Sequence, residues 1–163
     1  MKLQRSRKAF SMLTALVVMI LMATISVLVF NLSGKMVKGT TTQFLREQAI
    51  LLAKSYTEYA VMAITANDRN TTGNCITGIT GNNIIRQIDQ SGYRVRVNIS
   101  YIGNHTEVDH CTNNILYDNV LTPETPLSAI IDVYVEYKDI DSHEEDVNDR
   151  PWITYHRRTL QKI

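Results

Sequence analysis

The sequence predicts an α+β protein, in which a long N-terminal α-helix packs on a C-terminal antiparallel β-sheet of three to four strands. The first half of this helix is predicted to cross a membrane. Three observations support this fold. An uncharged run of 26 residues extends from Ala9 to Gly34, residues 41–66 contain neither proline nor glycine, and apolar and polar residues alternate in segments of the second half. Strands that follow a helix, with no further helix between them, favour a sheet packed on that helix.

The uncharged run is long enough to cross a bilayer. A helix needs about 20 apolar residues to span a hydrocarbon core of roughly 30 Å. Positions 10–32 contain thirteen Leu, Ile, Val or Phe residues, which together favour insertion by about 5 kcal/mol. We expect the hydroxyl groups within positions 10–32 to hydrogen-bond to carbonyl groups of their own helix. These hydroxyl residues are Ser11, Thr14, Thr24 and Ser26.

The charges on either side of the run predict its orientation. The leader before it contains Lys2, Arg5, Arg7 and Lys8, whereas only Lys35 and Lys38 follow closely. An excess of basic residues marks the cytoplasmic side, so residues 35–163 are expected on the outer side. The alternative is an ordinary cleaved secretory signal, which has an apolar core of about 7–15 residues and then a small-x-small site. Here the core is longer, and no Ala-x-Ala follows it.

Residues 35–66 are predicted to continue the helix with one apolar face. Apolar residues recur there at three-, four- and seven-residue steps, which is the helical period. They are Leu45, Leu52, Tyr56, Tyr59 and Ala63. A continuous helix from about Phe10 to Ala66 would be about 85 Å long at 1.5 Å per residue. Such a length suits a helix whose first half lies in lipid or among neighbouring helices.

Turn-forming residues from Asn67 to Asn74 end the predicted helix, and three strands are predicted after them. Residues 93–101 alternate apolar and polar side chains, as a half-buried strand does. Residues 129–137 form a second strand and residues 153–159 a third. The stretch 102–128 is expected to be irregular. The predicted organisation is a leader (1–9), a membrane helix (10–34), an amphipathic continuation (35–66) and a head domain (67–163).

The two cysteines, Cys75 and Cys111, both follow the membrane segment, and an even number in an exported domain favours a disulfide. The bridge would close a loop of about 37 residues and stabilise the domain by roughly 4 kcal/mol. The alternative is a metal site with His105, Asp109 and His110, but no spacing typical of zinc ligands is present. No other cofactor is predicted, and the basic residues form no concentrated face of the kind that binds nucleic acid.

The N-terminal motif resembles that of type IV prepilins and type II secretion pseudopilins. The matching residues are Lys8-Ala9-Phe10-Ser11-Met12-Leu13, which combine a basic residue, a small residue, a phenylalanine and an apolar helix. In that family a membrane-embedded prepilin peptidase cuts before the phenylalanine and methylates the new amino terminus. The resemblance therefore implies cleavage and methylation at Ala9–Phe10. Residues 1–32 carry it, and the rest of the chain agrees in predicted architecture only.

The chain departs from the family pattern at two positions. Ala9 stands where the family usually has glycine, and Thr14 stands where it usually has glutamate at the fifth mature position. A carboxylate within the bilayer is costly, and in the family it is thought to meet the methylated amino terminus of the adjacent subunit. Thr14 has no charge to offer. The resemblance then implies a minor subunit at the tip or in an initiating complex; the alternative is that apolar packing alone carries polymerisation.

The resemblance implies a structural, non-enzymatic subunit of a type IV pilus-like or type II secretion filament. Its implied partners are the prepilin peptidase, other pilin or pseudopilin subunits, the inner-membrane assembly platform and the membrane. Its implied location is the bacterial inner membrane, single-pass, with the N-terminus cytoplasmic and the C-terminal domain periplasmic, before extraction into a filament. The alternative is a signal-anchored periplasmic binding protein that does not polymerise.

Three further patterns are weaker. Six carboxylates lie within residues 139–149 and suit calcium, but without the EF-hand spacing, so a solvated loop is the alternative. They are Asp139, Asp141, Glu144, Glu145, Asp146 and Asp149. Asn70, in Asp-Arg-Asn-Thr-Thr, resembles an extended bacterial glycosylation sequon. The histidines His105, His110, His143 and His156 have no catalytic partner at a recognised spacing.

Overall fold

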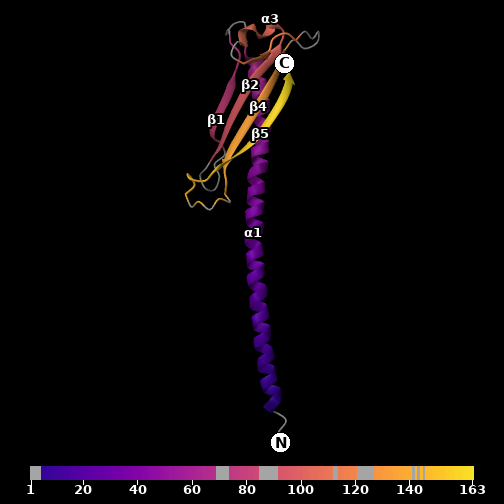
Figure 1. Cartoon of the computed structure of the whole chain (residues 1–163), viewed down its shortest axis with the longest axis vertical. Coiled ribbons are helices and arrows are strands. Elements are labelled where there is room, and N and C mark those ends of the chain that lie inside the picture. The colour runs from indigo at the N-terminus through magenta and orange to yellow at the C-terminus, as the bar shows by residue number, and fades with distance from the viewer. Residues whose placement is uncertain are drawn as a thin grey trace. The chain divides into compact units, whose positions relative to one another are not determined.

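The computed structural model describes residues 5–68, 74–84, 92–111, 114–120, 127–140, 142, 144 and 146–163. It divides into two compact units, Met1–Thr41 and Thr42–Ile163, which are called here the N-terminal and the C-terminal unit. Helix α1 (Arg5–Ala66) contributes to both units (Figure 1). The helix ends at the predicted residue and begins five residues earlier than expected, because residues 5–9 of the basic leader also have helical backbone.

The C-terminal unit contains the predicted α+β arrangement, with the last part of α1 packed on a largely antiparallel sheet. The four main strands follow the order β1-β2-β4-β5. They are β1 (Gly78–Ile84), β2 (Tyr93–Gly103), β4 (Leu127–Lys138) and β5 (Trp152–Lys162). Each neighbouring pair in this order is antiparallel. Strands β2, β4 and β5 correspond to the three predicted strands and are longer by one to three residues at one or both ends.

Two strands and a short helix were not expected from the sequence. Strand β1 has the sequence Gly-Ile-Thr-Gly-Asn-Asn-Ile, in which two glycines and two asparagines, residues depleted in strands, outnumber the three β-branched residues. Strand β3 (Ile115–Tyr117) pairs with β2 in parallel. The stretch 102–128 is therefore not simply irregular: it also contains α3 (His105–Val108) and the 3-10 turn Asp109–Cys111. Both unexpected strands form by pairing with β2. This pairing joins distant segments and cannot be predicted from the local sequence.

The core lies between α1 and one face of the sheet. The inward residues of β2 alternate strictly with exposed ones, and β4 contributes Ile131, Val133, Val135 and Tyr137 on the face predicted for them. The Tyr93 hydroxyl lies 3.1 Å from the Leu45 carbonyl oxygen and 3.0 Å from Gln48 Oε1, and its single proton is shared between these two acceptors. This contact ties β2 to the helix.

The buried face of the helix differs from the predicted one. Tyr59 was expected to face the core, but its side chain is exposed and meets Tyr56 edge to face, with ring centroids 6.2 Å apart. Ala49, Ala53 and Ala60 are completely buried instead. Small side chains let a helix backbone approach a sheet closely, so the contact follows the alanines rather than the largest apolar residues.

Candidate functional site

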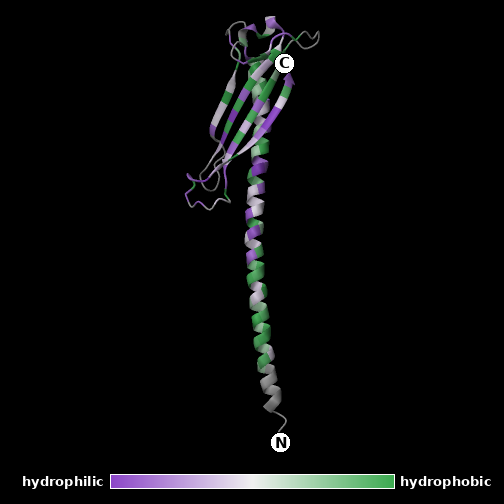
Figure 2. Cartoon of the chain, in the orientation of Figure 1, coloured by the Kyte–Doolittle hydropathy of each residue, from purple (hydrophilic) through white to green (hydrophobic). Residues whose placement is uncertain are grey.

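The N-terminal unit presents an uninterrupted apolar helix surface. Among the described residues, α1 is long and apolar enough to cross a membrane, with a mean hydropathy of 2.7 in its most apolar window and none of that window buried. Figure 2 shows this stretch as a nearly continuous hydrophobic band. Phe30 is 84% exposed and Met12 71%. An exposed apolar surface of this extent is suited to contact with lipid or with other apolar helices.

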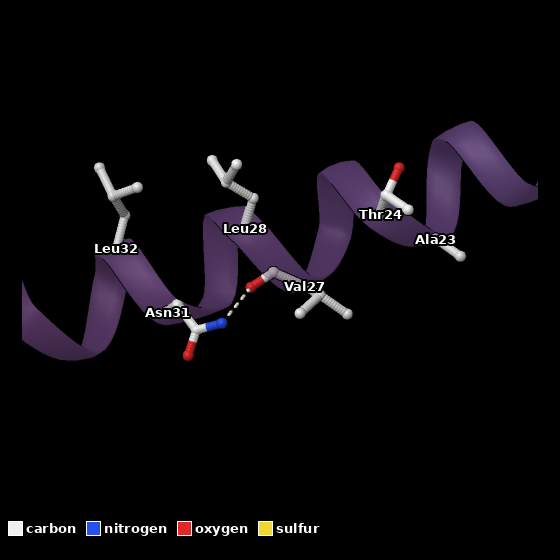
Figure 3. Close-up of a pocket in the computed structure, with 6 residues that line it drawn as sticks. All are labelled: Ala23, Thr24, Val27, Leu28, Asn31 and Leu32. Carbon is white, nitrogen blue, oxygen red and sulfur yellow. Dashed lines mark hydrogen bonds between the residues drawn. The ribbon is translucent and has the colours of Figure 1, made fainter.

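The polar groups within this apolar stretch are satisfied by their own helix. The Thr24 hydroxyl donates to the Leu21 carbonyl and the Ser26 hydroxyl to the Met22 carbonyl, each at 2.8 Å. These bonds confirm the predicted back-bonding for two of the four hydroxyl residues. The Asn31 amide donates to the Val27 carbonyl at 3.0 Å and lies beside a shallow surface groove (Figure 3). The groove is lined by Ala23, Thr24, Val27, Leu28, Asn31 and Leu32.

The residues of the proposed processing site lie in this same helix. Ala9 and Phe10 have helical backbone within α1, and their side chains lie outside the described part of the chain. Thr14 is on the exposed helix surface, one turn beyond Phe10. Thr14 therefore belongs to the exposed, largely apolar surface of α1.

The predicted disulfide is present. Cys75 and Cys111 are bonded, with their Cα atoms 4.8 Å apart. Cys75 lies just before β1, and Cys111 ends the 3-10 turn that follows α3. The bridge thus fixes the loop between β2 and β3 to the segment that enters β1. Because the two sulfur atoms are bonded to each other, neither cysteine has a thiolate for the metal site considered as the alternative.

The acidic loop and the sequon are only partly described. Within the described residues no group of three or more His, Cys, Asp or Glu side chains is arranged to hold a metal ion. Asp146 accepts hydrogen bonds from the backbone N–H and side-chain amide of Asn148, at 2.9 and 3.1 Å. Asp141, Glu145, His143 and the sequon residue Asn70 lie outside the described residues.

The outer face of the sheet carries an ionic cluster that sequence reasoning missed. The Asp132 carboxylate accepts hydrogen bonds from Arg158 Nε (2.8 Å) and Nη2 (2.9 Å), and its Oδ1 lies 2.7 Å from His156 Nε2. The hydrogen bond from Arg158, followed by that from His156, lowers the pKa of Asp132 below its ordinary value, although burial opposes this shift. The hydrogen bond to Asp132, together with the charge of that carboxylate, raises the pKa of Arg158.

Strand register explains how the cluster forms. Asp132 is directly opposite Arg158, and Tyr134 is directly opposite His156. The Tyr134 and His156 rings stack with centroids 4.4 Å apart. In sequence, the alternation along each strand places these residues on the outward side, but Asp132 is 24 positions from His156 and 26 positions from Arg158. Only the pairing of β4 with β5 identifies Asp132 as the carboxylate that contacts His156.

A second cation–aromatic cluster lies farther along the same face. The Arg94 guanidinium lies 3.9 Å from the Trp152 ring centroid, and the Lys138 ammonium 4.5 Å from it. Lys138 is largely buried and donates to the carbonyl oxygens of Asn148 and Arg150. Arg96 also pairs with Glu136 at 3.2 Å. Together the two clusters place charged groups and aromatic rings side by side on this face.

Comparison with known proteins gives no family assignment: no family model, no curated protein and no solved structure matches this chain.

Proposed function

We propose that this chain is a structural subunit, a minor pilin or pseudopilin, of a type IV pilus-like or type II secretion filament. In this proposal a prepilin peptidase cuts between Ala9 and Phe10 and methylates Phe10. The helix anchors the subunit in the bacterial inner membrane before assembly and lies in the filament core afterwards. The C-terminal unit faces the periplasm, and an assembly platform extracts the subunit from the membrane.

The observation that carries the proposal is the exposed apolar surface of α1 directly after a basic-small-Phe motif. The helix has no charged residue from Met12 to Leu32, and its large apolar side chains are exposed there, which is not the pattern of an amphipathic helix of a soluble domain. A lipid environment or a bundle of identical helices would each cover such a surface. A filament subunit requires the lipid environment before assembly and the helix bundle after it.

The C-terminal unit supports the same proposal. The helix continues beyond Thr42 with a buried face of Leu45, Ala49 and Ala53 and packs on the sheet. A soluble head built directly on the continuation of a membrane helix is the architecture that the resemblance implies. The disulfide suits an oxidising compartment such as the periplasm.

The proposal is tested by mass spectrometry of the mature N-terminus after co-expression with a prepilin peptidase. The expected product lacks residues 1–9 and begins with N-methylated Phe10, whereas an inactive peptidase leaves Met1 in place. Ala9→Gly is expected to be processed at least as fast as the native chain, and Ala9→Trp is expected to block processing. A chain that keeps Met1 beside the active peptidase contradicts the proposal and supports the signal-anchored, non-polymerising alternative.

The minor role is tested separately at Thr14. Thr14→Glu restores the carboxylate, and Thr14→Gln supplies the same shape without charge. If the missing charge limits self-addition, Thr14→Glu increases subunit pairing and filament incorporation, and Thr14→Gln does not. Equal incorporation of the native chain and both variants would remove the support for a minor role without affecting the processing assay.

A further inference from the structure

The two edges of the sheet differ in how they are protected against pairing with another chain (Figure 1). At one edge, β1 has seven residues, two of them glycine, and its register shifts between Gly81 and Ile84. At the other edge, β5 has eleven residues without proline and pairs with β4 without any register shift. Short or bulged edges resist further pairing, whereas a long regular edge strand is a template for it. Among the described residues, no strand covers the outer side of β5.

Hydrogen bonds at the ends of the β4–β5 ladder show which backbone groups of β5 face outward. The Ile163 N–H donates to the Leu127 carbonyl (3.1 Å), and the Asp139 N–H donates to the Pro151 carbonyl (3.0 Å). Bonded and non-bonded pairs alternate in an antiparallel ladder, so the odd-numbered residues of β5 bond to β4. The even-numbered residues direct their N–H and C=O groups away from it. They are Trp152, Thr154, His156, Arg158, Leu160 and Lys162.

The side chains of β5 define what an added strand must carry. The strand contains Arg157, Arg158 and Lys162 and no carboxylate. His156 and Arg158 are exposed on the outer face, with side-chain exposures of 41% and 66%. On the helix face, Tyr155 and Ile153 are only partly buried against the core. An added strand that carries carboxylates on its outer face and apolar side chains on its helix face would complement both surfaces.

The same charges oppose pairing of β5 with a second copy of itself. A centred antiparallel pair of two β5 strands would place Arg157 opposite Arg157. Like charges directly opposite each other destabilise a strand pair. The β5 edge is therefore regular enough to accept an added strand, but its positive charge disfavours pairing with a second copy of β5.

We propose that β5 accepts an extended acidic segment of a partner protein as a further antiparallel strand. Carboxylates of that segment lie beside His156 and Arg158 on the outer face, and its apolar residues lie beside Ile153 and Tyr155. Backbone bonds to the even-numbered residues of β5 supply affinity, and the alternation of side chains supplies specificity. This docking surface does not depend on how the N-terminal helix is processed.

The test measures binding of an eleven-residue peptide, in which Glu and Val alternate, to the full chain in non-ionic detergent. The fluorescein-labelled peptide is kept at low nanomolar concentration, and binding is followed by fluorescence anisotropy. The peptide is expected to bind at least tenfold more tightly than a peptide in which Lys replaces Glu. N-methylation of its Glu residues should weaken binding at least tenfold, whereas N-methylation of its Val residues should not, because only the Glu N–H groups face β5 in this register.

A pair of variants tests the edge itself. Thr154→Pro/Leu160→Pro removes two outward N–H groups and no bond to β4, since proline is tolerated where a strand N–H faces solvent. Thr154→Ala/Leu160→Ala also removes both native side chains but keeps both backbone N–H groups. We expect the proline pair to weaken peptide binding at least tenfold and the alanine pair to bind within twofold of the native chain. Melting temperatures without peptide verify that both variants are folded.

Three results would overturn the proposal. The first is equal affinity for the Glu and Lys peptides, and the second is equal tolerance of N-methylation at Glu and at Val. The third is self-association of the full chain through β5, seen as a dimer in sedimentation that the proline pair abolishes. The N-methylation result stands even if the proline pair fails to fold, because it requires no change in the protein.

Discussion

Replacing Asp132 with asparagine tests the ionic cluster on the outer face of the sheet. Asp132 is 8% exposed, and its carboxylate accepts two hydrogen bonds from Arg158 and lies within hydrogen-bond distance of His156. Asparagine keeps the shape of the side chain but removes the charge, and it replaces one accepting oxygen by an NH2 group that cannot accept a hydrogen bond. The substitution therefore weakens each of these bonds and removes at least one of them.

The expected loss of stability is modest because both partners are largely exposed. A hydrogen bond to a charged group contributes about 1.5–3 kcal/mol, and exposed ion pairs contribute roughly 0–1 kcal/mol. For a buried carboxylate with exposed partners, we expect Asp132→Asn to lower the unfolding free energy by about 1–2 kcal/mol at pH 7. For a unit of this size, that corresponds to a decrease in melting temperature of roughly 4–8 °C.

The pH dependence gives the sharper measurement. The pKa of Asp132 is lowered in the folded chain, so its ionised form stabilises the fold above the pKa of the unfolded chain, about 3.9. This contribution disappears as the pH falls through the lower folded pKa. The stability difference between the native chain and Asp132→Asn should therefore be constant above about pH 5 and shrink below about pH 4.

The chain has a single tryptophan, Trp152, which lies at the start of β5 and reports unfolding of the sheet. Its fluorescence is followed during thermal unfolding of the full chain in non-ionic detergent from pH 3 to pH 8. Asp149→Asn, which removes one exposed carboxylate from the loop before β5, is the matched control and should change the melting temperature by less than 1 °C. Equal destabilisation by Asp132→Asn at pH 3 and pH 7 would refute the role assigned to the ionised carboxylate.

Three further predictions concern the disulfide and two glycines. Removing the bridge by Cys75→Ser/Cys111→Ser is expected to lower the unfolding free energy by about 4 kcal/mol. A native chain that melts at the same temperature under reducing and under oxidising conditions would contradict this. Gly78→Ala is expected to destabilise the sheet by about 1–3 kcal/mol, because the added Cβ would lie 2.9 Å from a backbone carbonyl of β2; the Trp152 melting curve measures this. Gly39→Ala meets nothing within 4 Å and should favour the helix by about 1 kcal/mol; a loss of helical circular dichroism would show that the glycine is needed for a bend.

The sequence predicted those elements whose signal is local. The uncharged run, the helical period up to Ala66 and the alternation in β2 and β4 each arise from residues that are neighbours along the chain. The disulfide was predictable because only one pairing of two cysteines exists. The motif at Ala9–Phe10 and the departure at Thr14 are likewise visible in sequence, and their function is a proposal that processing and assembly experiments will decide.

Sequence alone therefore determined the helix, the main strands and the segment suited to a membrane, because hydrophobic burial imposes a period on each of them. Tertiary structure decided which helix face is buried, where Ala53 and Ala60 replace Tyr59 because small side chains permit close packing. It also decided that glycine-rich β1 is a strand, since β2 supplies its hydrogen-bond partners. Finally, it placed Asp132 beside His156 and Arg158 and left β5 as the long regular edge, because strand register is a relation between distant residues.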